Sequence, residues 1–198
     1  MKFPQLNHFI LITLFLQLFC IVFASSNCTQ TITFIKKECN ATRFQNSCIT
    51  TLVPFACKIK PGDQTELCRI ALNTSVGTSQ NALQMLLNMS QESNVKGNTT
   101  EVGVISDCID TYLTIIDYIM MASQMMNTRV INESTLVNLK LQISGLIESI
   151  ANWESQCLKK VDGQHVVDSL RKRIYGVVVP CIKLNKIIST LVNRIHIS

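Results

Sequence analysis

The chain contains few of the residues that break helices or separate domains. Four prolines and seven glycines are spread over 198 residues, and no Gly/Ser-rich or low-complexity tract divides them. This composition predicts one domain that is large enough to bury a core. Aromatic residues make up only 6% of the chain. Together with an acidic middle region, this argues against nucleic acid as a partner.

Residues suited to catalysis or metal binding are also scarce. Of the three histidines, His8 lies in the N-terminal apolar segment, His165 in a predicted loop and His196 near the end. None is placed beside a serine or cysteine nucleophile. The sequence has no C-x-x-C, H-x-x-x-H or calcium-loop pattern. It therefore predicts no enzyme activity, no metal site and no cofactor.

One apolar run dominates the N-terminus. Residues 9–23 are mostly apolar, follow Lys2 and end near the sequence Val22-Phe23-Ala24, which suits a signal peptidase. This run of about 15 residues is shorter than the roughly 20 that span a bilayer. We expect residues 1–24 to be a secretory signal peptide, with an uncleaved anchor as the alternative. Cleavage would remove Cys20 and leave eight cysteines, an even number consistent with disulfides.

Sequons for N-glycosylation recur along the chain. One N-x-S/T match is weak because the pattern is short, but six behind a signal peptide favour a secreted glycoprotein. A glycan lies on the surface, so each sequon also predicts an exposed position. The acceptor asparagines are Asn27, Asn40, Asn73, Asn88, Asn98 and Asn132.

Charge is unevenly distributed. Residues 61–158 carry ten acidic and four basic residues, whereas residues 159–198 carry eight basic and two acidic ones. The two regions could attract one another, present opposite potentials to a partner, or form ordinary solvated helix faces.

A pair of cysteines brackets a polar turn between Glu38 and Leu52. Cys39 and Cys48 lie nine positions apart in E-C-N-A-T-R-F-Q-N-S-C-I-T-T-L. Short helices are predicted on either side, over residues 29–37 and 42–52. Closed as a disulfide, the cysteines would staple these arms into a hairpin and remove about 2 to 3 kcal/mol of chain entropy from the unfolded state.

Four longer segments repeat apolar residues at three- and four-residue steps, the pattern of amphipathic helices. They run from 64 to about 92, from 100 to 126, from about 134 to 157, and from the turn at 162–163 to about 195. Asn132 and Ser134 both suit an N-cap of the third. The expected core positions are Leu67, Ile70, Ala71, Leu83, Leu86 and Leu87, then Val102, Ile105, Ile109, Tyr112, Ile116 and Ile119, then Leu136, Leu139, Ile143, Leu146, Ile150 and Trp153.

These segments predict an all-α fold. Four amphipathic helices joined by short loops favour an up-down-up-down four-helix bundle over about residues 64–197. The N-terminal hairpin, about residues 27–55, would pack against the bundle or project from it, within one domain of residues 25–198. A coiled-coil oligomer would explain the periodicity equally well, but the similar lengths and tight connections favour packing within one chain.

Three cysteine-containing motifs follow one another along the chain. Residues 39–44 read C-N-A-T-R-F and close with Cys48, residues 105–112 read I-S-D-C-I-D-T-Y, and residues 151–157 end at Cys157. They resemble the N-terminal signature, the leucine-x-aspartate-cysteine helix and the fourth cysteine of the plant inhibitors of invertase and pectin methylesterase. The likeness runs over nearly the whole of residues 25–198.

The resemblance implies a four-helix bundle with an N-terminal hairpin and the disulfides Cys39–Cys48 and Cys108–Cys157. Such proteins are not enzymes, and they occlude the active-site cleft of a carbohydrate-active enzyme with a rigid helical surface. The expected partner is therefore a protein enzyme, bound by one inhibitor molecule in a 1:1 complex. The expected location is the apoplast or cell wall, with no membrane or nucleic acid as partner.

The chain differs from the family pattern because it has four additional cysteines: Cys28, Cys57, Cys68 and Cys181. A bond between Cys57 and Cys68 could close a short loop over the turn at 61–62, which would leave Cys28 and Cys181 to pair or to stay free. Cys181 also suits a buried position as a small hydrophobic residue.

The target enzyme is less strongly marked. Invertase inhibitors often carry Pro-Lys-Phe in the loop between the last two bundle helices, whereas residues 158–165 here read L-K-K-V-D-G-Q-H. The sequence therefore favours pectin methylesterase over cell-wall or vacuolar acid invertase. Asp110, Thr114 and Asp117, on the polar face of the 100–126 helix, are the candidate contacts. A third alternative is a divergent member with a structural or signalling role and no enzyme target.

Overall fold

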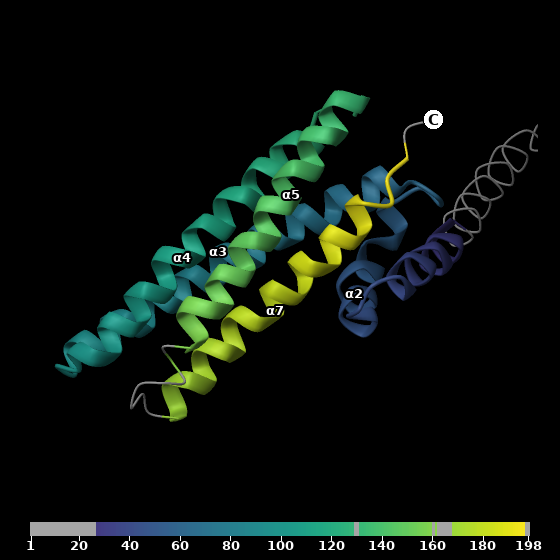
Figure 1. Cartoon of the computed structure of the whole chain (residues 1–198). Helices are drawn as coiled ribbons and strands as arrows, with labels where there is room; N and C mark the ends of the chain where they lie inside the picture. The colour runs from purple at the N-terminus through teal and green to yellow at the C-terminus, as the bar shows by residue number, and fades with distance from the viewer. Residues whose placement is uncertain (1–26, 129–130, 160, 162–167, 197–198) are drawn as a thin grey trace, which may run out of the picture.

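The chain is predominantly helical in the computed structural model, which describes residues 27–128, 131–159, 161 and 168–196 (Figure 1). Within these ranges no residue is in a strand. The all-α prediction is therefore confirmed. The expected signal peptide, residues 1–24, lies outside the described residues, as do most of residues 158–165.

The helices follow the order that the periodicity predicts. A first helix spans residues 27–40. It is followed by α2 (Gln45–Leu52), the 3₁₀ segment η1 (Val53–Lys58), α3 (Gln64–Val95), α4 (Thr99–Met126), α5 (Glu133–Trp153), the π-helical turn η2 (Glu154–Leu158) and α7 (Asp168–Val192). The four long helices begin and end within a few residues of the predicted bounds.

Polar caps start three of the long helices. The side-chain oxygens of Asp63, Asn98 and Asn132 accept hydrogen bonds from backbone N–H groups three residues later, at 2.9, 3.1 and 2.8 Å. These bonds satisfy donors that have no partner inside the helix. Gly62 and Gly97 precede the first two caps with φ of 86° and 71°, a left-handed backbone that glycine adopts without strain. Tight capped turns therefore precede α3 and α4.

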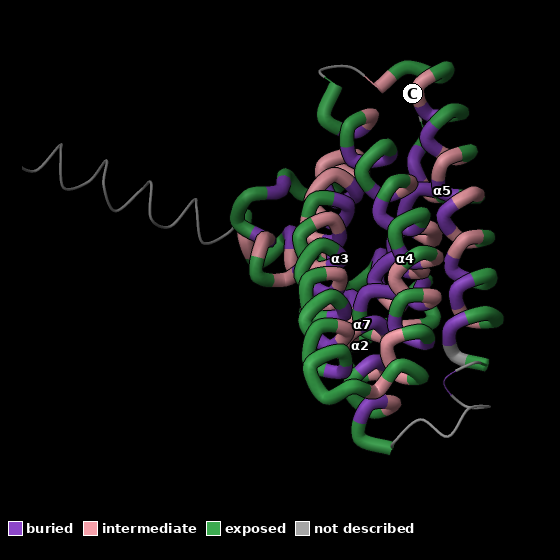
Figure 2. Tube along the Cα trace, turned by 90° about the vertical axis from the view of Figure 1, so that its left-hand side faces the viewer, coloured by how far each residue is buried: buried purple, intermediate pink, exposed green. Residues whose placement is uncertain are grey.

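The long helices pack side by side as an antiparallel bundle (Figures 1 and 2). α4 lies between α3 and α5, and α7 completes the ring by packing against both α3 and α5. The face between α4 and α5 is therefore opposite the face between α3 and α7. α2 packs against α3 and α7 and so lies on that second face. The ring is the predicted up-down-up-down bundle with its hairpin packed on one side.

An aromatic pair and a disulfide lie together in the core near the C-terminal end of α5. Trp153 and Tyr112 are fully buried, and their rings meet edge to face with centroids 6.2 Å apart. The indole Nε1 of Trp153 donates a hydrogen bond to the backbone oxygen of Cys108 at 3.0 Å. Cys108 itself is bonded to Cys157. Covalent, hydrogen-bonding and packing contacts therefore join α4 to the end of α5 at one place.

α7 contains one long apolar stretch with few charged residues. It has the length and composition of a membrane span, but half of its most apolar window is buried inside the protein. Its exposed side pairs with neighbouring helices, since Arg173 lies 2.9 Å from Glu92 of α3 and Lys186 lies 2.7 Å from Glu154 of η2. α7 is thus a core helix of the bundle.

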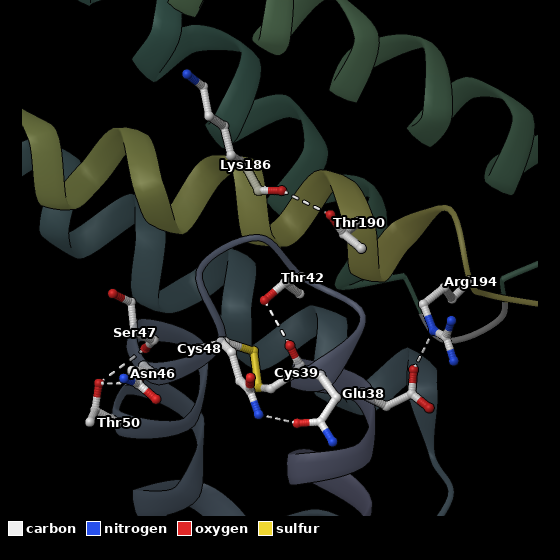
Figure 3. The surroundings of a disulfide bond; sticks show 12 residues. Glu38, Cys39, Thr42, Asn46, Ser47, Cys48, Thr50, Lys186, Thr190 and Arg194 are labelled. Atoms are coloured by element: carbon white, nitrogen blue, oxygen red, sulfur yellow. Dashed lines mark hydrogen bonds and ion pairs between the residues drawn. A yellow bond between two sulfur atoms is a disulfide. The ribbon is translucent and has the colours of Figure 1, made fainter.

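Two disulfides hold the N-terminal region. Cys39 is bonded to Cys48 across the polar turn (Figure 3), as the family resemblance implies. The prediction that Cys57 bonds to Cys68 is wrong, because Cys57 is bonded to Cys28, with 4.5 Å between the two Cα atoms.

The helix of residues 27–40 explains this pairing. This helix lies antiparallel to the segment formed by α2 and η1. The hydroxyl of Thr31 donates a hydrogen bond to the backbone oxygen of Ile59, just after η1, at 3.0 Å. Cys57 is exposed, whereas Cys68 is 1% exposed on the core side of α3. Cys68 and Cys181 are both free and buried, so they pack as small hydrophobic side chains.

The hairpin is also anchored to the end of the chain. The carboxylate of Glu38, whose side chain is only 4% exposed, accepts a hydrogen bond from the guanidinium Nε of Arg194 at 2.7 Å (Figure 3). Ile35 and Leu52 are fully buried nearby in the same core. The hairpin therefore packs on the bundle as part of one structure.

Candidate functional site

The three predicted contact residues share one exposed side of α4. Asp110, Thr114 and Asp117 are all exposed, and their spacing of four and three residues places them along a single helical stripe. The opposite side of α4 carries buried residues such as Tyr112 and Ile119. The polar face of this helix is therefore free to meet a partner.

A groove runs between this stripe and α5. It has a volume of about 590 Å³. Thr114 and Tyr118 of α4 line one side, and Gly145, Glu148 and Asn152 are among the residues of α5 that line the other. Asp110 and Asp117 lie about one turn from Thr114 along α4. The structure thus extends the predicted single-helix surface into a groove formed by two helices.

The groove depends on a close approach of Tyr118 to Gly145. A Cβ atom at Gly145 would lie 2.6 Å from Cζ and 3.0 Å from the hydroxyl oxygen of Tyr118. These distances are too short for any side chain, so only glycine lets the tyrosine ring lie across the backbone of α5. The ring of Tyr118 therefore forms part of the groove lining directly over Gly145.

Sequence reasoning missed the contribution of α5. Its signal was present in the sequence, because Gly145, Glu148, Asn152 and Ser155 follow one another at steps of three and four residues. Such a repeat predicts a polar stripe along a helix, just as apolar repeats predict a buried one. Only the apolar stripe of this segment was used to predict the fold.

The two helices that form the groove have an acidic balance. Residues 99–153, which contain α4 and α5, carry six acidic and two basic residues. Asp110, Asp117 and Glu148 are exposed around the groove. A partner that presents basic or hydrogen-bond-donating groups would be complementary to this face.

The groove face is also free of sequons. Asn73 and Asn88 lie on α3, Asn98 and Asn132 lie at the turns before α4 and α5, and Asn27 and Asn40 lie at the two ends of the first helix. Asn98 is partly exposed and the other five are exposed, so each position could accept a glycan. None lies on the surface that Thr114 and Asn152 line.

Catalytic or metal-binding groups do not gather in the part of the chain that the structure describes. No group of three His, Cys, Asp or Glu side chains there has the arrangement of a metal site. His196 is exposed near the end of the chain, and His165 lies outside the described residues.

The described chain is thus a hairpin stapled by disulfides and packed on a four-helix bundle, with a groove between α4 and α5 on the far side. The family model for the plant invertase/pectin methylesterase inhibitors matches residues 33–193. The chain therefore belongs to this family, whose description is that of enzyme inhibitors.

One characterised relative is similar to part of the chain. Pectinesterase inhibitor 4 from Arabidopsis thaliana is 31% identical over 78 residues, which cover 39% of this chain and 38% of that protein. The similarity therefore spans well under half of the relative. A comparison with solved structures gave no match.

Proposed function

We propose that this chain is a secreted inhibitor that binds a pectin methylesterase through the α4–α5 face and covers its active-site cleft. The similarity to Pectinesterase inhibitor 4 supports this target. The lack of a Pro-Lys-Phe motif in residues 158–165 also favours it over acid invertase. The inhibitor would act as a monomer in a 1:1 complex in the plant cell wall.

The observation that carries the proposal is the groove between α4 and α5. The Cys108–Cys157 disulfide joins α4 to the turn that follows α5, and Trp153 is hydrogen-bonded to the backbone of α4 beside it. The two walls of the groove are therefore held in one relative position. A preorganised surface loses little conformational entropy when it binds, which favours tight inhibition.

Glycan placement supports the same face. All six proposed acceptor asparagines lie on other parts of the surface, at helix ends or along α3. A fully glycosylated protein would therefore keep the α4–α5 groove open to an enzyme. By contrast, glycans on Asn73 and Asn88 would shield parts of the surface of α3.

A pair of inhibition assays tests the target. The secreted, oxidised protein is added to a plant pectin methylesterase and, separately, to a plant acid invertase. We expect inhibition of the pectin methylesterase and full activity of the invertase. Inhibition of invertase alone would overturn the proposed target, and inhibition of neither enzyme would favour a structural or signalling role.

Charge reversal tests the face. Asp110→Lys combined with Asp117→Lys should raise the inhibition constant for pectin methylesterase by about 10-fold or more, because like charges then meet across the interface. The matched control is Gln80→Lys with Gln91→Lys, two exposed positions on α3. The control should inhibit like the unmodified protein. Equal inhibition by both variants would remove the α4–α5 face from the interface.

A further inference from the structure

A second grooved surface, lined by polar and apolar side chains, lies on the opposite side of the bundle along α2. Two adjoining grooves meet there at Ser47, which lines both. The smaller groove, about 310 Å³, is lined by residues 43–47. The larger, about 500 Å³, lies between α2, α3 and α7. We call the two together the α2 groove.

Two unpaired cations flank an aromatic ring in this groove. The guanidinium carbon of Arg43 and the amine of Lys183 each lie 6.0 Å from the centre of the Phe44 ring. Neither cation forms an ion pair with any carboxylate that the structure describes, although Lys186 and Arg194 on the C-terminal side of Lys183 do. The α2 groove therefore holds positive charge that no part of the described protein neutralises.

Hydroxyl groups line part of the α2 groove, beside the apolar side chains of Pro180, Leu184 and Ile187. The hydroxyl groups come from Ser47, Thr50, Thr51, Thr74 and Thr78. Three of them donate their protons to backbone oxygens of their own helices: Thr50 to Asn46 at 2.9 Å, and Thr74 and Thr78 to residues four positions earlier at 2.8 Å (Figure 3 shows Thr50). Their remaining lone pairs are free to accept hydrogen bonds from a ligand. No aspartate or glutamate lines either groove.

The ligand that matches this surface carries both anionic groups and hydroxyl donors. Cations bind carboxylates, hydroxyl oxygens accept hydrogen bonds from sugar hydroxyls, and the ring of Phe44 offers an apolar face to C–H groups. A polymer of uronic acids combines all three features. A simple polyanion such as polyphosphate offers the charge but not the hydroxyl donors or the C–H face.

The surrounding hairpin strengthens this preference. Residues 27–60 carry five basic residues and one acidic residue, and that acid, Glu38, is already paired with Arg194. The exposed lysines Lys36, Lys37, Lys58 and Lys60 extend the positive potential beyond the groove. They would raise the rate of association with any long polyanion.

We infer that the α2 groove binds a polymer of uronic acid, with Arg43 and Lys183 binding its carboxylates. Hydrolysis of the methyl esters of pectin by a pectin methylesterase produces free carboxylates on such a polymer. The choice of this polymer rests on the proposed function, whereas the cationic groove itself does not. An inhibitor bound to the enzyme through α4 and α5 would then hold the enzyme's product on its opposite side.

Calorimetric titration of the secreted protein with an oligogalacturonate tests this inference. Arg43→Gln with Lys183→Gln should raise the dissociation constant about 10-fold or more, while the matched pair Lys36→Gln with Lys37→Gln raises it less than about 3-fold. Both variants should inhibit pectin methylesterase like the unmodified protein. Thermal unfolding of both variants should also match it, which shows that the fold is retained.

Further ligands separate the sources of affinity. The fully methyl-esterified oligomer should bind at least about 10-fold more weakly, because its carboxylates are neutralised. The affinity for polyphosphate should fall by the same factor in the groove variant, Arg43→Gln with Lys183→Gln, as in the control variant, Lys36→Gln with Lys37→Gln. Equal losses from the groove pair and the control pair with oligogalacturonate would overturn the site, as would equal binding of the esterified oligomer. These titrations do not depend on inhibition, so a failure of the proposed target leaves their outcome readable.

Discussion

The N-terminal hairpin and the four-helix bundle are held together in different ways. The hairpin region, residues 27–60, has two disulfides and few fully buried apolar residues, notably Ile35 and Leu52. The bundle has a continuous apolar core across α3, α4, α5 and α7 and one disulfide. In the short hairpin, which buries little apolar surface, disulfides supply stability that the bundle gains from its apolar core.

The two regions also differ in charge. The hairpin carries five basic residues and one acidic residue, whereas residues 99–153 carry six acidic and two basic residues. The basic hairpin and the acidic α4–α5 face lie on opposite sides of the bundle. Opposite potentials on opposite faces allow one small protein to meet two different partners without competition.

Removing the core aromatic should give the largest effect on stability. Trp153→Ala should lower the free energy of unfolding by about 3 to 5 kcal/mol, because it leaves a large cavity and removes a buried hydrogen bond. Leu141→Ala on the same helix is the control, since Leu141 is 63% exposed. Urea denaturation measures both. A similar loss from the two variants would show that the bundle core is not where the stability resides.

Removing disulfides should separate the two regions. Cys108→Ala with Cys157→Ala removes a disulfide between residues 49 positions apart and should lower the free energy of global unfolding by about 4 kcal/mol. Cys39→Ala with Cys48→Ala removes a disulfide between residues nine positions apart and should lower it by about 2.5 kcal/mol. Hydrogen exchange should show faster exchange in residues 27–60 for the second variant, with the bundle unchanged. Faster exchange throughout the bundle would mean that the hairpin supports the core.

Alkaline pH should destabilise the bundle through its buried acids. Burial raises the pKa of Cys68 and Cys181 above 9.0, and burial with the neighbouring Cys181 raises the pKa of Tyr112 above 10.0. The unfolded chain therefore loses these protons first, so their stabilisation is complete below about pH 9 and falls as pH rises. The expected slope above each ordinary pKa is about 1.4 kcal/mol per pH unit for each group.

Denaturation midpoints at pH 8, 9 and 10 measure this slope. Cys68→Ala with Cys181→Ala should reduce it substantially, leaving the contribution of Tyr112. The two thiols should also resist alkylation in the native protein at pH 8 and react after unfolding. A slope unchanged by the double variant would contradict the assignment to these cysteines.

The sequence predicted the helices better than it predicted which residues of different segments lie side by side. All six expected core positions of α5 are buried, because α5 presents one narrow stripe. On α4, Val102 and Ile109 are only partly buried while Val104 and Ile115 are buried, since a helix packed between two others buries a wider arc than one stripe. On α3, Leu87 is 43% exposed.

Neighbours that are distant in sequence were harder to predict. The Cys28–Cys57 bond forms because the first helix packs alongside η1. The spacing of the cysteines in the sequence does not indicate this packing. Likewise, the pattern of one helix predicted the exposed stripe of Asp110, Thr114 and Asp117, but not the groove beside it. That groove is lined by Thr114 together with residues of α5, and Tyr118 lies on Gly145 there. Periodicity describes one helix at a time, whereas a groove is a property of two.

The footprint of a pectin methylesterase on the inhibitor tests the central claim most directly. Hydrogen exchange of the inhibitor, alone and bound to the enzyme, would report protection along the whole described chain. We predict slower exchange on binding at residues 106–121 and 141–155 and unchanged exchange at residues 27–60. Protection confined to residues 27–60, with α4 and α5 unchanged, would contradict the claim that the α4–α5 face binds the enzyme.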